Sequence, residues 1–170
     1  MPGKVLTAMV IAAGLMAVAF VARVGISSGP PPPEVNLDVM IEDLRGVKID
    51  LASYAGKPLV INLWATWCGP CRLETPQLVA LAEKFGPRGV TIIGISVDDL
   101  PDAVRAFADE FKVTYPMLVG VGHEDFIRSL GYRDLLPFSV LVHADGTVAG
   151  QVTGLKTTAD WERRIEALLH

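Results

Sequence analysis

Two cysteines, Cys68 and Cys71, are the only cysteines in this chain of 170 residues, and they lie where a strand pattern changes into a helix pattern. The run before them, residues 58–64, is short and apolar and contains valine and isoleucine, which predicts a buried strand. After them, apolar residues recur at helical spacing up to a Gly-Pro pair that ends the helix, namely Leu73, Leu78, Val79, Leu81, Ala82 and Phe85. A buried strand therefore leads into the first turn of a helix that carries both cysteines.

The predicted position of Cys68 favours thiol–disulfide exchange. Unpaired N–H groups and the positive end of the helix dipole stabilise an anion at the first turn, so the thiol there ionises more easily. In Cys-X-X-Cys sequences, thiol pKa values fall to roughly 3.5–7.5 from about 8.5. The thiolate is the attacking species, and a second thiol one turn away can resolve the mixed disulfide. Gly69 permits a tight helix start, and Pro70 fits a first turn, where its missing N–H costs nothing.

A structural disulfide and half of a zinc site are the alternatives for such a pair. A bridge that closes so short a loop removes little chain entropy from the unfolded state. A zinc site needs two more cysteine or histidine ligands, and the sequence offers no matching pair. We therefore favour a redox-active pair and expect neither a cofactor nor a metal site.

The N-terminal part of the chain predicts a membrane segment. Residues 5–22 form an uncharged, largely apolar stretch of eighteen residues between Lys4 and Arg23, near the lower limit for spanning a bilayer. The stretch suits either an uncleaved anchor or the core of a long signal peptide, and we favour the anchor. Lys4 suits an N-terminus left in the cytoplasm, so the remainder of the chain is expected across the membrane.

A run of four prolines, residues 30–33, predicts a stiff polyproline spacer after this segment. The expected organisation is a signal-anchor or transmembrane segment over residues 1–26, a proline-rich linker over 27–34 and one domain over 35–170. The net charge of −4 comes without a basic cluster, so nucleic acid is not expected as a partner.

The domain alternates strand and helix patterns. Asp98 and Asp99 are expected to cap the helix that follows them; the alternative is that one of them adds a second acidic group to the site from the end of its strand. Trp161 is expected to face inward from the last helix. The elements expected around the cysteine region are strands over 36–41 and 47–51, a helical turn over 51–56, a strand over 89–97, a helix from 101 to about 112, an extended piece over 115–119, a short helix over 124–130, a hairpin over 138–143 and 148–152, and a last helix from Thr157 or Thr158. This order predicts an α/β domain of three layers.

Three motifs resemble those of the thioredoxin fold, namely the run Trp67-Cys68-Gly69-Pro70-Cys71, Pro76 and the pair Leu136-Pro137. The wider runs over residues 60–76 and 136–146 are similar to the membrane-tethered TlpA/ResA/CcmG branch of extracytoplasmic thiol–disulfide oxidoreductases. The resemblance covers about residues 35–169. It implies a thioredoxin-like three-layer fold, in which helices flank a central mixed β-sheet.

The resemblance also implies roles for individual residues. Cys68 matches the attacking cysteine, Cys71 the resolving cysteine, and Pro137 the cis-proline that faces the disulfide. The backbone of Leu136 would then be free to pair with an extended substrate segment. Without the family, Pro137 could equally be a loop residue that ends before a strand. The further expected substrate contacts are Trp67, Gly69 and Pro70.

A proton acceptor for Cys71 is the open question of this site. Asn62 stands where thioredoxin carries a buried aspartate, and an amide cannot exchange a proton. Glu74 is the nearest candidate, because it follows Cys71 by three residues on the helix, and the branch carries a functional glutamate at this position. The alternative is a solvated glutamate paired with Arg72 or Lys84, and the sequence does not decide between the two.

The predicted function is that of an enzyme, a thiol–disulfide oxidoreductase that reduces disulfides in protein substrates outside the cytoplasm. The resemblance implies a single-pass protein of the bacterial inner membrane, with its domain in the periplasm or otherwise outside the cytoplasm. It also implies a membrane electron donor of the DsbD/CcdA kind, and substrates such as apocytochrome c or a copper-site protein of a terminal oxidase.

Two other functions compete with this interpretation. A peroxiredoxin-like peroxidase would share the fold and use a cysteine to reduce peroxide. A Cu(I)-binding chaperone would use Cys68, Cys71 and a histidine, His123 or His143, as soft ligands.

Overall fold

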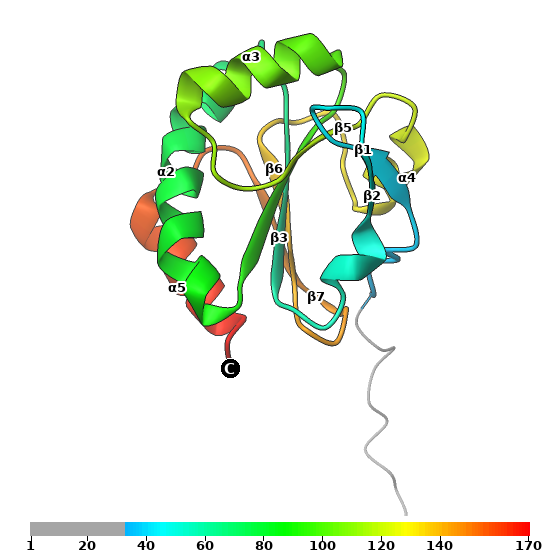
Figure 1. Cartoon of the computed structure of the whole chain (residues 1–170). Helices are drawn as coiled ribbons and strands as arrows, with labels where there is room; N and C mark the ends of the chain where they lie inside the picture. The colour runs from blue at the N-terminus through cyan, green and yellow to red at the C-terminus, as the bar shows by residue number, and fades with distance from the viewer. Residues whose placement is uncertain (1–32) are drawn as a thin grey trace, which may run out of the picture. The chain divides into compact units, whose positions relative to one another are not determined.

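The computed structural model describes residues 33–170, and their centre is a mixed β-sheet with the strand order β5-β4-β3-β6-β7 (Figure 1). The strands β3, β4 and β5 run parallel, whereas β6 is antiparallel to β3 and β7 is antiparallel to β6. The strands are β3 (Leu59–Trp64), β4 (Thr91–Ser96), β5 (Met117–Val119), β6 (Phe138–Val142) and β7 (Val148–Thr153). The expected central mixed sheet is therefore confirmed.

Helices flank the sheet, and each face has its own apolar core. One face carries α2 (Gly69–Phe85), which continues into the 3-10 helix η2 (Gly86–Arg88), α3 (Pro101–Phe111) and α5 (Thr158–Ala167). The connections β3-α2-β4 and β4-α3-β5 advance toward the same edge, so right-handed crossovers place α2 and α3 on the same face. The other face carries α4 (Glu124–Ser129), the hairpin of β1 (Met40–Glu42) and β2 (Lys48–Asp50), and the 3-10 helix η1 (Leu51–Tyr54).

Every residue of β3 is buried, because this strand has a neighbour on each side and a core on each face. Its single polar side chain belongs to Asn62, which lies opposite Gly94 on β4 and Ser139 on β6. The strands β3 and β4 end together, with Trp64 opposite Ser96. The segments that follow them therefore meet at one edge of the sheet, where ligands bind in open α/β sheets.

The elements expected from the sequence are present, and most are shorter than expected. The strand expected over residues 36–41 begins only at Met40, and the strand expected over 89–97 spans Thr91–Ser96. The expected core face of α2 is wrong at its N-terminal end. Leu73, which fits the apolar helical spacing, is 66 % exposed, whereas the neighbouring Glu74 is 1 % exposed.

The expected transmembrane segment over residues 1–26 and most of the expected linker over 27–34 lie outside the described residues. Within residues 33–170, none of the helices has the length and apolar character needed to cross a membrane. The last two linker residues are hydrogen-bonded to the domain. The carbonyl of Pro33 accepts from the N–H of Val148, and Glu34 forms an isolated β-bridge with Thr147.

Candidate active site

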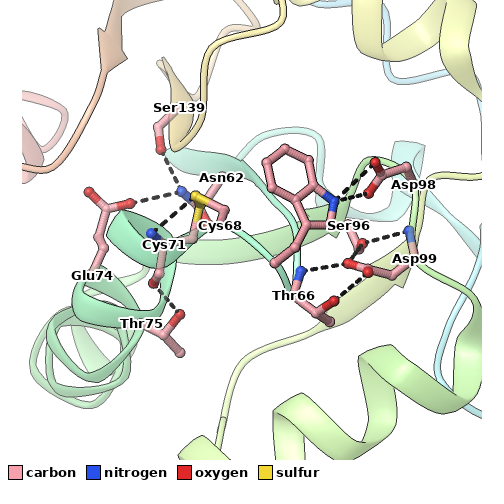
Figure 2. The surroundings of a disulfide bond; sticks show 11 residues. Asn62, Thr66, Cys68, Cys71, Glu74, Thr75, Ser96, Asp98, Asp99 and Ser139 are labelled. Atoms are coloured by element: carbon pink, nitrogen blue, oxygen red, sulfur yellow. Dashed lines mark hydrogen bonds between the residues drawn. A yellow bond between two sulfur atoms is a disulfide. The ribbon is translucent and has the colours of Figure 1, made fainter.

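The two cysteines form a disulfide at the N-terminus of α2 (Figure 2). Cys68 is the N-cap of this helix, and its Sγ accepts a hydrogen bond from the backbone N–H of Cys71 at 3.2 Å. Both residues are buried, with exposed fractions of 4 % and 2 %. The N–H of Cys71 and the positive end of the helix dipole favour a thiolate at Cys68 once the bond is reduced. The expected strand, turn and helix around the cysteines are therefore confirmed.

Pro137 is buried and lies at the same end of the sheet as the disulfide. The peptide bond between Leu136 and Pro137 is cis, as the resemblance implies. Phe138, the first residue of β6, pairs with Leu63 on β3. Pro137 therefore lies at the level of Trp64, the residue after which the chain turns toward the cysteines. Leu136 is half-buried and packs against the cores on both faces of the sheet.

Trp67 forms an exposed wall beside the buried disulfide. Its side chain is 65 % exposed, and its indole N–H donates to both carboxylate oxygens of Asp98 at 3.1 Å. Gly69 and Pro70, the other two expected substrate contacts on this side, are also exposed. A groove of about 320 Å³ begins at the indole and is lined by Trp67, Val97, Asp98, Glu124, Ile127, Arg128, Tyr132 and Asp134.

Asp99 accepts three short hydrogen bonds, two from Thr66 in the segment before Cys68 and one from Ser96 at the end of β4 (Figure 2). Its carboxylate accepts from the backbone N–H of Thr66 at 2.7 Å, from the hydroxyl of Thr66 at 2.5 Å and from the hydroxyl of Ser96 at 2.6 Å. The expected capping of α3 by Asp98 and Asp99 is wrong, because the N-cap is Leu100 and no side chain caps this helix. The ends of β3 and β4 are adjacent, so both acids reach across to the cysteine segment instead.

Glu74 is buried between the central sheet and α5. Its Oε2 accepts a hydrogen bond from Nδ2 of Asn62 at 3.2 Å, and its Oε1 accepts one from Nε1 of Trp161 at 3.2 Å. The same Nδ2 of Asn62 donates to the hydroxyl of Ser139 at 3.0 Å. Figure 2 shows Glu74 and Cys71 projecting from the same part of α2.

Burial raises the pKa of Glu74 to about 7, from a usual value of 4.5. The hydrogen bonds from Trp161 and Asn62 favour the charged form, as does the positive charge of Lys156. These interactions offset only part of the effect of burial. The carboxyl group can therefore gain and lose a proton near neutral pH.

The structure excludes one of the two interpretations of Glu74 that the sequence leaves open. The solvated alternative is wrong, because the side chain is buried and neither suggested partner contacts it. Arg72 pairs with Glu110 and lies over the ring of Phe111, and Lys84 pairs with Glu162 on α5 at 2.6 Å.

Three residues of the site are missing from the sequence-based prediction, namely Thr66, Ser139 and Trp161. Thr66 and Ser139 carry no local signal, because their partners are 33 and 77 residues away in the sequence. Trp161 has a usable signal. A tryptophan that faces the core needs an acceptor for its indole N–H, and a carboxyl group on a neighbouring helix can supply one.

A Cu(I) site would need a histidine beside the cysteine pair. His123 precedes α4 and His143 follows β6, and both are half-buried. Within residues 33–170, no group of three or more His, Cys, Asp or Glu side chains is placed to hold a metal ion.

Fold and site together define a class of protein. A disulfide between Cys68 and Cys71 starts the helix that follows the central strand of a mixed sheet, and a cis-proline lies at the same end of that sheet. This is the arrangement of thioredoxin-fold thiol–disulfide oxidoreductases.

Comparisons with known proteins narrow the class. The model of the Redoxin family matches residues 28–169, so the chain belongs to this family. It is 33% identical over 129 residues to the thiol-disulfide oxidoreductase ResA of Bacillus thuringiensis subsp. konkukian, which covers 76% of this chain and 73% of the relative. The ResA of Geobacillus kaustophilus is 30% identical over 149 residues, or 88% of this chain and 82% of the relative.

A solved structure agrees with these sequence matches. The crystal structure of a thioredoxin-family thiol:disulfide interchange protein from Chlorobium tepidum TLS has a TM-score of 0.75 and 27% identity, and the match covers 84% of this chain and all 100% of that one. The predicted resemblance and the predicted enzyme class, a thiol–disulfide oxidoreductase with a Cys-X-X-Cys pair, are confirmed.

Proposed function

We propose that this chain reduces disulfides in protein substrates outside the cytoplasm, with Cys68 as the attacking cysteine and Cys71 as the resolving one. One observation carries the proposal. The disulfide lies at a helix start, three residues from a buried carboxyl group whose pKa is about 7. This combination supplies a nucleophile, a resolving thiol and a proton acceptor within the first two turns of α2.

In the reducing direction, the thiolate of Cys68 attacks one sulfur of the substrate disulfide, and the substrate S–S bond breaks as the new bond forms. The displaced sulfur leaves as a thiolate and takes a proton from solvent. Cys71 then loses its proton, attacks Sγ of Cys68 and releases the second substrate thiolate. Two electrons pass to the substrate, and the enzyme is left with its own Cys68–Cys71 disulfide.

Glu74 is the proposed acceptor of the Cys71 proton. Residues three apart on a helix are neighbours on its surface, and both side chains face the interior. A general base works best when its pKa lies near the operating pH, and the pKa of Glu74, about 7, meets this condition. The amide of Asn62, which contacts Glu74, cannot take the proton.

The substrate is proposed to bind across the end of the sheet. The exposed Trp67, Gly69 and Pro70 form one side of the approach to the disulfide. Leu136 and Pro137 form the other side, where the backbone ahead of β6 can pair with an extended segment of the substrate. Because this pairing uses the backbone of the substrate, substrates of different sequence could present a disulfide to Cys68.

The proposed location is the outer side of a bacterial inner membrane, with residues 1–26 as a single-pass anchor and the proline-rich linker as a spacer. The support comes from the uncharged stretch and the proline run of the sequence. The enzyme disulfide must be reduced again after each turnover, and we propose a membrane electron donor of the DsbD/CcdA kind. Proposed substrates are apocytochrome c or a copper-site protein of a terminal oxidase.

Cysteine variants of the full-length chain test the proposal. Cys68→Ser should abolish reduction of a protein disulfide in single turnover, because it removes the attacking thiolate. Cys71→Ser should form mixed disulfides that accumulate, because nothing resolves them, and mass spectrometry would find the substrate attached to Cys68. Exchange that survives in Cys68→Ser would overturn the assigned roles.

A further inference from the structure

We propose that Asn62 and Trp161 are positioning residues for Glu74, and that Asn62 and Glu74 form one functional unit of an amide and a carboxyl group. The inference rests on the proposed role of Glu74 as the proton acceptor. Under this proposal, strand β3 and helix α5 each supply a side chain that holds the carboxyl group of Glu74 beside Cys71.

Two side chains from other elements of the fold donate hydrogen bonds to Glu74. Besides a backbone hydrogen bond from Lys156 that favours its charged form, each oxygen of Glu74 has one side-chain donor, Asn62 on β3 and Trp161 on α5, both at 3.2 Å. Neither donor belongs to α2, the helix that carries Glu74 and the cysteines. The carboxyl group is therefore held from two sides by other elements. A protonated carboxyl group still accepts hydrogen bonds, so the same donors can hold it in both protonation states.

The amide of Asn62 is oriented by Ser139 on the neighbouring strand. Its nitrogen has two hydrogens, and the structure uses them on Glu74 and on Ser139, at 3.2 and 3.0 Å. Asn62 and Ser139 face each other in the ladder between β3 and β6. The sheet thereby fixes the hydroxyl that orients the amide, and the nitrogen is directed at the carboxyl group.

The side chains that donate to Glu74 are neutral, and the nearby positive charge comes from Lys156. Both positioning side chains are neutral donors, so they favour ionisation of Glu74 without supplying a charge. Lys156, in the connection between β7 and α5, contributes a positive charge, but its Nζ donates to the carbonyls of Thr153 and Gly154 at 2.7 and 3.3 Å. Burial, together with the charge of Glu74, raises the pKa of Tyr115. Cys68 and Cys71 do not titrate while they are joined in the disulfide.

An amide suits position 62 better than a carboxylate would. A carboxylate there would place two acceptors about 3.2 Å apart in a buried site, and like charges so close cannot both persist. One proton would be shared between them, and ionisation would belong to the pair. The amide avoids this competition and leaves Glu74 as the single group that titrates.

The first test replaces Asn62 with aspartate, which keeps the shape and turns a donor into an acceptor. We expect the carbon-13 titration of the Glu74 carboxyl, in the oxidised full-length protein, to move upward by about one pH unit or more in Asn62→Asp. Asn36→Asp is the matched control, because Asn36 is the other asparagine of the chain and, among residues 33–170, its side chain bonds only the N–H of Asp38. An Asn62→Asp titration that matches wild type would overturn the proposal.

The second test exchanges the two groups. Glu74→Gln should slow the resolution of a mixed disulfide and remove its pH dependence. The double variant Asn62→Asp/Glu74→Gln restores one carboxyl and one amide group, so we expect a pH-dependent resolution that is about 10-fold or more faster than in Glu74→Gln. A double variant as slow as Glu74→Gln would show that the two residues are not a unit.

The third test removes the donor on α5. Trp161→Phe should raise the Glu74 titration midpoint, because the charged form loses a hydrogen bond, and it should not alter resolution in the Glu74→Gln background. An unchanged midpoint would exclude Trp161 from the positioning role.

The titration needs no turnover, so it separates the proposed pairing of Asn62 with Glu74 from the proposed function of the protein. Normal exchange with an unshifted Asn62→Asp titration would overturn the unit alone, whereas a shifted titration in a protein that exchanges nothing would overturn the proposed function.

Discussion

Two buried carboxyl groups flank the cysteine segment, and the fold supplies them with donors in different ways. Asp99 accepts three hydrogen bonds of 2.5–2.7 Å from Thr66 and Ser96. Glu74 accepts two hydrogen bonds of 3.2 Å from Asn62 and Trp161. Short bonds from several donors tie a carboxylate to its place, whereas few and longer bonds in an apolar surrounding leave the cost of burial uncompensated. Asp99 is thus an anchor, and Glu74, with a pKa of about 7, is a group that can change its charge.

The location of the donors explains the difference. Asp99 lies beyond the end of β4, where it meets the backbone and hydroxyl of the segment that leaves β3. Glu74 lies under α2, between the sheet and α5, where the neighbours are mainly apolar. The same side-chain chemistry therefore fixes the cysteine segment on one side and, on the other, provides a carboxyl group with a pKa of about 7.

The largest expected effect is on the pH dependence of stability, and it tests the Glu74 side. Unfolded, Glu74 has a pKa near 4.5, and folded it has a pKa of about 7, so the folded state holds a proton that the unfolded state releases between these values. The stabilisation is complete below pH 4.5 and is lost as the pH rises through about 7. The shift corresponds to a decrease in the free energy of unfolding on the order of 3 kcal/mol.

Urea unfolding at a series of pH values checks this expectation. The comparison is between wild type and Glu74→Gln, because other groups titrate equally in both proteins and cancel in the difference. The two stability curves should converge at low pH and change relative to each other across the window from 4.5 to about 7. Curves that stay parallel would mean that Glu74 does not hold its proton in the folded state.

A smaller effect is expected on the Asp99 side. Asp99→Ala removes three hydrogen bonds and leaves the N–H of Thr66 without its acceptor, so we expect a loss of about 2 kcal/mol in the free energy of unfolding. Asp98→Ala is the matched control, because its carboxylate contacts only the exposed indole of Trp67, and its effect should stay within about 0.5 kcal/mol.

The same variant tests whether the two carboxyl groups are independent. Asp99→Ala should leave the carbon-13 titration of Glu74 unchanged, because the two acids share none of their hydrogen-bond partners. A Glu74 midpoint that moves in Asp99→Ala would break the division into an anchor and a proton-exchanging group.

The sequence predicts the local part of the site well, because strand, turn and helix signals lie next to each other around Cys68. It fails where contacts join distant segments. Local capping chemistry favours Asp99 as a helix cap, and only the pairing of β3 with β4 brings it to Thr66. Apolar spacing favours Leu73 over Glu74 as the buried residue, and the structure has the reverse. Local rules are expected to fail most at functional sites, where a buried acid serves chemistry rather than packing.

The smallest expected effect concerns Ser139, which orients the amide that holds Glu74. Ser139→Ala leaves one hydrogen of Asn62 without an acceptor in a buried site, and we expect a loss of about 1 kcal/mol in the free energy of unfolding. Ser53→Ala is the control, because its hydroxyl bonds an exposed carbonyl and should matter less.

Ser139 also separates positioning by the sheet from direct donation to the carboxyl group. Asn62 keeps its hydrogen bond to Glu74 in Ser139→Ala, so the Glu74 titration should shift less than in Asn62→Asp. An equal shift in both variants would mean that the hydroxyl of Ser139, and not the amide itself, sets the acidity of Glu74. Glu74 would then depend on the strand that follows Pro137, and the anchor and the proton-exchanging group would differ in which strand controls them, β4 for Asp99 and β6 for Glu74.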